Sequence, residues 1–257
     1  MARPARAPAV PISTPGPTRF LNELDSLSLI QKAGLPVIEH RLCHSADEAR
    51  AAAAAFGGID VCVNNASAIS LTPIDKTDPK RFDLMFGINT RGTFVTTQAC
   101  LPHLKKSANP HVLMMSPPLD MKSQWFAGHV AYTMAKFGMS MCVLGMAEEF
   151  KDDGIAFNAL WPRTGIATAA IEFALTGEEG LRHCRSVDIM SDAAYAIFNK
   201  PSRECTGNFF IDDVLLYAEG ERDFDKYRVD PAKDLMPDFF VPADTPVPPG
   251  VSMNAKR

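Results

Sequence analysis

Apolar and polar positions alternate along the chain with two different periods. Short, nearly continuous apolar runs are typical of strands in a parallel sheet that is covered on both faces. Such runs occur at residues 59–65, 111–116, 155–162 and 207–213. Between these runs the apolar residues recur near helical spacing, which predicts helices. The predicted helices span residues 78–107, 129–154 and 191–201.

The first part of the chain continues this alternation. Residues 20–34 predict a helix and residues 35–42 a strand. Residues 45–58 predict an alanine-rich helix, because Ser45 and Glu48 have the spacing of a capping box. Strands and helices that alternate at this spacing predict an α/β fold with a Rossmann-like, doubly wound parallel sheet.

The same pattern divides the chain into three parts. Residues 1–19 carry three arginines, five prolines and no acidic residue, which favours a disordered tail over an organelle transit peptide. Residues 20–218 are expected to form one folded domain. Residues 219–257 are charged and rich in proline, which predicts an irregular C-terminal tail that is draped on the surface or disordered.

Composition narrows the possible partners and compartments. The chain has 257 residues and a net charge of -4, which argues against nucleic acid or an anionic membrane as the main partner. No apolar run has the length of a membrane span, so we expect no transmembrane segment. The six cysteines show neither a CxxC pair nor the spacing of a metal site, which favours a reducing, intracellular compartment. Peroxisome, mitochondrion and cytoplasm all stay open.

Polar residues follow three of the predicted strands. Asn64 and Asn65 end the first strand, Ser116 ends the second, and residues 158–162 end the third. Because ligands of such sheets bind beyond the carboxyl ends of the strands, these residues are expected to border one cleft.

Tyr132 and Lys136 lie four residues apart in the predicted helix 129–154. They therefore project from the same helix face. A nearby ammonium favours the phenolate and lowers the pKa of a tyrosine, which prepares the phenol for acid–base catalysis. The ammonium can also donate hydrogen bonds to the hydroxyls of a sugar. The alternative is a chance spacing, with Lys136 simply in solvent.

Four stretches of sequence favour the catalytic interpretation of Tyr132 and Lys136 over a chance spacing. They are DVCVNNASAIS, INTRGTF, AYTMAKFGMS and NALWPRTGIAT, and their order and approximate spacing resemble the short-chain dehydrogenase/reductase family. The resemblance implies an NAD(P)-dependent oxidoreductase that interconverts a carbonyl and an alcohol by hydride transfer. The apolar stretches WFAGHV and IEFAL beside the expected pocket favour a lipid-like substrate.

The resemblance also implies a role for each matching residue. Tyr132 is the proton donor or acceptor, and Lys136 binds the nicotinamide ribose and lowers the pKa of Tyr132. Asn89 kinks its helix and holds a water that links Lys136 to solvent, and Asn64 ties neighbouring strands together. The residues implied to border the cofactor are Asn64, Asn65, Ala66, Lys136, Pro162, Ile166 and Thr168. No metal is implied.

Two positions depart from the family's pattern. Ser116 is the candidate for the catalytic serine, but it lies further before Tyr132 than is usual and two prolines follow it. Ser123 is a poorer candidate because it belongs to a loop, and Ser116 could equally be a turn former at the strand end. Ser67 replaces a glycine of the family's usual NNAG motif.

The largest departure concerns the glycine-rich loop that binds the pyrophosphate at a helix N-terminus. This sequence contains no such loop, so we expect a sheet truncated at its N-terminal βαβ unit. Two functions stay open: an active oxidoreductase, or a truncated or non-catalytic relative that cannot bind the dinucleotide. The resemblance implies NADP or NAD as cofactor, with a preference for NADP, and a homo-oligomer as the assembly.

Overall fold

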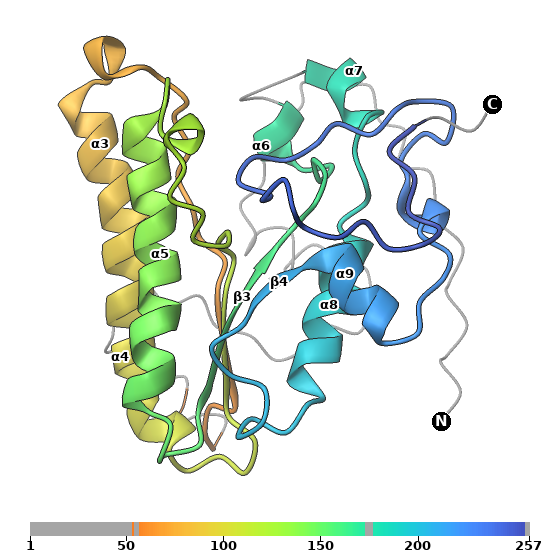
Figure 1. Cartoon of the computed structure of the whole chain (residues 1–257). Helices are drawn as coiled ribbons and strands as arrows, with labels where there is room; N and C mark the ends of the chain where they lie inside the picture. The colour runs from red at the N-terminus through yellow and green to blue at the C-terminus, as the bar shows by residue number, and fades with distance from the viewer. Residues whose placement is uncertain (1–52, 54–56, 173–176, 255–257) are drawn as a thin grey trace, which may run out of the picture. The chain divides into compact units, whose positions relative to one another are not determined.

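The computed structural model describes residue 53 and residues 57–172 and 177–254 (Figure 1). The predictions for the N-terminal tail, for helix 20–34, for strand 35–42 and for most of helix 45–58 lie outside the described residues. The prediction of a missing βαβ unit concerns the same region.

The described strands form one parallel sheet, as predicted. They are β1 (Val61–Asn64), β2 (His111–Met114), β3 (Ala156–Trp161) and β4 (Phe209–Ile211). Their order in the sheet is β1-β2-β3-β4, and each neighbouring pair is parallel. The carboxyl ends of the strands therefore lie at one edge of the sheet, where the polar residues after β1, β2 and β3 come together.

Helices cover the sheet on both faces, which confirms the doubly wound arrangement (Figure 1). One layer contains α3 (Pro79–Met85), the π-helix η2 (Phe86–Gly92), α4 (Thr93–Leu104) and α5 (Val130–Glu149). The other contains α8 (Asp188–Phe198) and α9 (Asp212–Ala218). Shorter helical segments are η1 (Ile74–Lys76), η3 (Ser123–Trp125), α6 (Ala169–Ile171), α7 (Gly177–Leu181) and η5 (Asp225–Tyr227).

The segment predicted as one helix at 78–107 is interrupted by a π-helical stretch. Asp78 caps its start by accepting a hydrogen bond from the backbone N–H of Lys80. The backbone then widens over residues 86–92, a stretch centred on Asn89. Such π-helical turns are frequent at functional sites. The break therefore falls where the family resemblance places a kink.

Helix α5 packs closely on η2 because Gly138 has no side chain. A Cβ at this position would lie 2.5 Å from Thr90 Oγ1. Thr90 uses that hydroxyl to donate to the backbone oxygen of Ala135 at 3.0 Å. By length and composition α5 could span a membrane, but 61% of its most apolar window is buried inside the protein.

The C-terminal part from residue 219 is irregular, as expected, but it is not a surface tail in the part that the structure describes. Phe224, Tyr227 and Phe240 are buried, and Phe240 is fully inaccessible. Phe240 adopts a positive φ of 66°, a conformation that is strained for a bulky residue. Its ring lies 5.9 Å from that of Trp161 and 6.0 Å from that of Tyr132. Burial of these rings keeps the segment in place.

Replacement of Phe240 tests whether this segment belongs to the core. Phe240→Ala should lower the free energy of unfolding by about 3–5 kcal/mol, because it leaves a cavity among aromatic rings. Phe239→Ala is the matched control, since Phe239 is 37% exposed. It should cost roughly half as much or less. Urea denaturation of both variants measures the difference. If both variants lost the same small amount of unfolding free energy, the segment would not belong to the core.

Candidate active site

A cleft of about 470 Å³ opens at the carboxyl ends of the strands. Its volume lies within the range of pockets that bind small molecules and cofactors. Its described lining comes from the loop after β1, the end of β2, helix α5, the end of β3 and the segments that follow, and the C-terminal part. The lining residues are Asn65, Ser67, Ile69, Met115, Tyr132, Lys136, Trp161, Pro162, Ile166, Thr168, Ile171, Val187, Met190, Ser191, Asp238 and Phe239.

The cleft brings together most of the side chains that the sequence singled out. They are Asn65, Tyr132, Lys136, Pro162, Ile166 and Thr168. Four other candidates are not among the lining residues, namely Asn64, Ala66, Asn89 and Ser116. Asn64, Ala66 and Ser116 belong to segments that border the cleft, and Asn89 hydrogen-bonds to Ala68 in one of these segments.

Tyr132 and Lys136 lie side by side on α5 and are almost completely buried, with exposed fractions of 6% and 4%. The Lys136 ammonium donates to the backbone oxygen of Met115, just beyond β2, at 2.9 Å. It also lies over the ring of Trp161, 5.2 Å from the centroid. Lys136 is therefore not in solvent, which excludes the alternative of a solvated surface lysine.

The expected lowering of the pKa of Tyr132 does not occur in this arrangement. Burial raises the pKa of the phenol above its ordinary value, and the negative charge of Asp238 raises it further. The Lys136 ammonium is committed to the Met115 oxygen, and burial lowers its own pKa to about 8. Desolvation of the phenolate thus outweighs the favourable effect of a neighbouring cation. Tyr132 holds its proton at neutral pH.

Ser116 is buried behind the cleft. Its hydroxyl is inaccessible and has no hydrogen-bond partner among the described residues. The loop that carries it is fastened to α5 on both sides, because Lys136 donates to Met115 and Ser140 donates to the Pro117 oxygen at 2.6 Å. The serine hydroxyls that do line the cleft belong to Ser67 and Ser191. Sequence reasoning treated Ser67 only as a substituted glycine.

Asn89 and Asn64 fasten the loop after β1. The Asn89 side chain accepts from the backbone N–H of Ala68 at 2.7 Å and donates to its oxygen at 3.0 Å. Asn64 donates to Thr97 on α4 at 3.0 Å. The backbone oxygen of Asn64 accepts from the N–H of Met115, just beyond β2, at 3.1 Å. Asn64 therefore ties its strand both to a helix and to the neighbouring strand, as predicted. The water predicted to join Asn89 to Lys136 stays a prediction.

A buried ionic cluster holds the loop after β3. Arg163 follows Pro162 directly, and its guanidinium donates to Asp213 at 2.7 Å. The backbone N–H of Arg163 donates to Asp212, and Arg185 reaches Asp213 at 3.1 Å. Burial and the neighbouring Asp213 raise the pKa of Asp212 to about 6. The cluster fixes the direction in which Pro162 faces the cleft.

The C-terminal residues Asp238 and Phe239 also line the cleft, and sequence reasoning missed both. They were assigned to a surface tail because proline and charge dominate that region. The signal that could have found them is the apolar run around Phe239–Phe240, which interrupts the charged, proline-rich C-terminal part. Large aromatic side chains in such a segment indicate that it packs on the core.

The donor set of the cleft fits the nicotinamide end of a dinucleotide. Lys136 has an ammonium with three donors, of which one donates to the Met115 oxygen and a second faces the Met139 sulfur at 3.9 Å. The Asn65 amide and the Thr168 hydroxyl line the same cleft beside the apolar side chains of Pro162 and Ile166. No glycine-rich loop for the pyrophosphate occurs among the described residues.

This site can be compared with known proteins. The sequence profile of the family described as short chain dehydrogenase matches residues 44–174, about half of the chain. The chain belongs to the short-chain dehydrogenase family. It is 58% identical over 186 residues to hydroxysteroid dehydrogenase-like protein 2 from Danio rerio, covering 72% of this chain and 44% of that protein. The chain thus spans less than half the length of this relative.

Two solved structures extend the comparison to three-dimensional folds. A Xanthomonas campestris protein assigned as a dehydrogenase is 42% identical, with a TM-score of 0.78 and coverage of 90% of this chain and 86% of that one. A short chain dehydrogenase from Mycobacterium thermoresistibile is also 42% identical, with a TM-score of 0.76 and coverage of 92% and 85%. The fold is therefore the Rossmann-like fold of this family.

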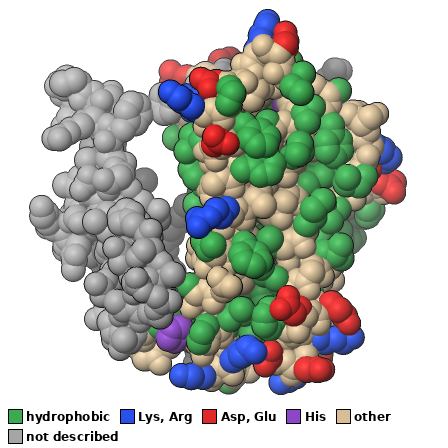
Figure 2. All heavy atoms as spheres, turned by 90° about the vertical axis from the view of Figure 1, so that its left-hand side faces the viewer, with side chains coloured by type: hydrophobic (Ala, Val, Ile, Leu, Met, Phe, Trp, Pro, Cys, Tyr) green, Lys and Arg blue, Asp and Glu red, His purple; other side chains and the backbone are tan. Residues whose placement is uncertain are grey.

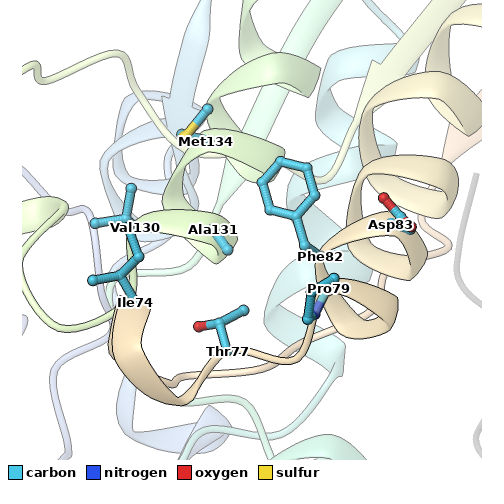
Figure 3. Close-up of a pocket in the computed structure, with 8 residues that line it drawn as sticks. All are labelled: Ile74, Thr77, Pro79, Phe82, Asp83, Val130, Ala131 and Met134. Atoms are coloured by element: carbon cyan, nitrogen blue, oxygen red, sulfur yellow. The ribbon is translucent and has the colours of Figure 1, made fainter.

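A second pocket of about 300 Å³ lies between α3 and the start of α5. Figure 3 shows its apolar wall, formed by Ile74, Phe82, Val130 and Met134, with Thr77 and Asp83 at its border. These residues of α5 do not line the first cleft. The candidate catalytic residues Tyr132, Lys136, Asn89 and Ser116 are not among the residues that line this pocket.

The protonation state of Tyr132 can be measured by ultraviolet difference titration. The absorbance of phenolate near 295 nm in the wild type minus that in Tyr132→Phe should stay near zero up to pH 10, because burial raises the pKa of Tyr132. Circular dichroism at each pH checks that the fold is retained. A difference band that is half developed at or below pH 10 would mean that Lys136 dominates after all.

Proposed function

We propose that the protein is an NAD(P)-dependent oxidoreductase that interconverts a carbonyl and an alcohol on a lipid-like substrate. The observation that carries the proposal is the meeting of Tyr132 and Lys136 with Pro162, Ile166 and Thr168 in one cleft. Membership of the short-chain dehydrogenase family supports the reaction class. A nicotinamide supplies the hydride when it is bound, and the protein orients the reactants.

Tyr132 is the proton donor of the proposed reaction. Because its pKa is raised, the phenol is protonated at neutral pH and can give its proton to a developing alkoxide, a stronger base than phenolate. This protonation state favours reduction of a carbonyl over oxidation of an alcohol. In the reverse direction the phenolate would have to form first, at a cost set by its burial.

Lys136 is proposed to hold the ribose of the cofactor. Its pKa of about 8 leaves the ammonium predominantly charged at neutral pH. The bond to Met115 fixes its position, a second donor faces the Met139 sulfur at 3.9 Å, and the third is left for a hydroxyl group. The apolar side chains of Pro162 and Ile166 would flank the nicotinamide, and the Thr168 hydroxyl would bind its amide. The choice of NADP over NAD rests on the family resemblance.

The proposed substrate is apolar because most of the cleft wall is apolar. The apolar lining residues are Ile69, Met115, Trp161, Pro162, Ile166, Ile171, Val187, Met190 and Phe239. Of the two stretches expected beside the pocket, IEFAL contributes Ile171, whereas Trp125 and Phe126 of WFAGHV are not among the lining residues. Burial of a hydrocarbon chain against this wall would supply binding energy in proportion to its area.

A second candidate function is a relative of these enzymes that cannot bind the dinucleotide. It is favoured by the lack of a glycine-rich loop in the sequence. Loss of the pyrophosphate contacts would weaken cofactor affinity strongly, since each 1.4 kcal/mol is about tenfold.

Cofactor titration and turnover separate the two functions. We expect saturable binding of NADPH, followed by its fluorescence, and a loss of affinity of at least about tenfold in Lys136→Ala. Tyr132→Phe should keep the affinity and lose about 100- to 10,000-fold in turnover, the usual contribution of general acid catalysis. NADH serves as the parallel ligand. No binding at millimolar cofactor would establish the second function, and unchanged turnover in Tyr132→Phe would remove Tyr132 from the mechanism.

We further propose that the protein forms a homo-oligomer through its α3–α5 layer. Figure 2 shows a broad area of hydrophobic side chains on this face. The large exposed apolar residues on these helices are Leu84, Ile88, Phe94, Met134, Met141 and Leu144. Apolar areas of this extent on a protein surface mark interaction sites.

Charge placed on this face should separate the subunits. Met141→Glu combined with Leu144→Glu should give a monomer in size-exclusion chromatography with light scattering, where the wild type gives a larger species. Both side chains are more than half exposed, so the fold should be retained. Met121→Glu is the matched control, since Met121 is exposed on a loop outside these helices. A monomeric wild type would end this proposal.

An intracellular location is also proposed. The cysteines of the described residues are free thiols, which supports a reducing compartment.

A further inference from the structure

Residues 236–240 of the C-terminal part form a fixed wall of the cleft. The backbone N–H of Gly165 donates to the oxygen of Met236 at 2.9 Å, and Asp238 N–H donates to the oxygen of Arg163 at 2.9 Å. The indole N–H of Trp161 donates to the oxygen of Phe239 at 2.7 Å. These bonds fasten the segment to the end of β3 and to the loop after it.

Asp238 is the acidic residue among the described residues that line the cleft. One of its carboxyl oxygens accepts from the backbone N–H of Phe239 at 2.6 Å. Its other oxygen has no hydrogen-bond partner among the described residues. Asp238 is half-buried and lines the cleft, so this free oxygen can accept a hydrogen bond from a ligand or from water. An asparagine at position 238 could accept the same hydrogen bond from Phe239 N–H. This bond therefore does not explain why the residue is an aspartate.

The charged and titratable groups near Asp238 come from several elements. Tyr132 and Lys136 face it from α5, and Asp212 from the start of α9. Cys184 lies near it from the segment before α8. Burial and the charge of Asp212 raise the pKa of Asp238 to about 7, and Lys136 opposes this rise. At pH 8 the carboxylate is predominantly charged.

We propose that Asp238 is a specificity-determining residue that binds a hydroxyl group close to the reacting carbon of the substrate. The substrate would be an apolar hydroxy-carbonyl compound, whose hydroxyl donates to the free oxygen of Asp238. A substrate with a carboxylate or phosphate at the same place would be excluded by repulsion between like charges. This inference rests on the proposed reductase function and names the substrate class of the same cleft.

Matched ketones test this assignment. Three probes share one linear carbon chain and carry hydrogen, hydroxyl or carboxylate at the β-carbon. At pH 8 the wild type should reduce the hydroxyl ketone with a kcat/KM about 100-fold above that of the carboxylate ketone. In Asp238→Asn, which keeps an acceptor for Phe239, this ratio should fall by about tenfold or more. Asp244→Asn is the control, since Asp244 is exposed and lies outside the cleft, and it should keep the wild-type ratio.

Ligand binding without cofactor separates this inference from the proposed function. Trp161 lines the cleft, and a Trp125→Phe background leaves it as the sole tryptophan. The hydroxyl ketone should quench Trp161 fluorescence at a lower concentration than the carboxylate ketone, and Asp238→Asn should narrow the difference. The reductase function fails if no probe is reduced. The role of Asp238 still stands in that case if the wild type binds the hydroxyl ketone at a lower concentration than the carboxylate ketone and Asp238→Asn makes this difference smaller. An unchanged ratio in Asp238→Asn, or no discrimination in the wild type, overturns the role of Asp238.

Discussion

The hydrogen bond from Lys136 to the backbone oxygen of Met115 joins the central helix to the edge of the sheet where the cleft opens. It fixes the ammonium in a buried place and, together with the bond from Ser140 to Pro117, holds the loop after β2 against α5. The same contact explains two features at once. It turns Ser116 away from the cleft, and it limits how strongly the cation can act on the phenol of Tyr132. The chemistry of the cleft therefore depends on which groups accept hydrogen bonds from the Lys136 ammonium.

The pKa values of Tyr132 and Lys136 are shifted more by desolvation than by their charged neighbours. Burial raises the pKa of Tyr132 and lowers that of Lys136 to about 8, so the phenol is neutral and the ammonium stays predominantly charged at neutral pH. Asp238 adds a negative charge that raises the pKa of both. A carboxylate beside a phenol keeps the proton on the phenol, which suits a group that donates a proton during reduction. The cleft is thus arranged around a protonated tyrosine.

Much of this arrangement can be predicted from the sequence. The apolar runs predict the parallel strands, and the four-residue spacing of Tyr132 and Lys136 predicts a shared helix face. The predicted lowering of the pKa of Tyr132 was wrong because periodicity does not show what covers a helix face. The covering segment is Asp238–Phe240, which is distant in sequence and lacks regular secondary structure. The burial of Ser116 was likewise missed, since it depends on carbonyl contacts of its neighbours.

The fixed C-terminal segment has a consequence for the synthesis of the protein. Walls of the cleft come from residues as far apart as Asn65 and Phe239, so the cleft is incomplete until Phe239 has left the ribosome. Until Phe240 has been translated, it cannot pack against the rings of Tyr132 and Trp161, which stay exposed to water on the nascent chain. Apolar surface exposed at this stage is prone to aggregation. Translation of residues 238–240 therefore completes the cleft and covers the rings of Tyr132 and Trp161.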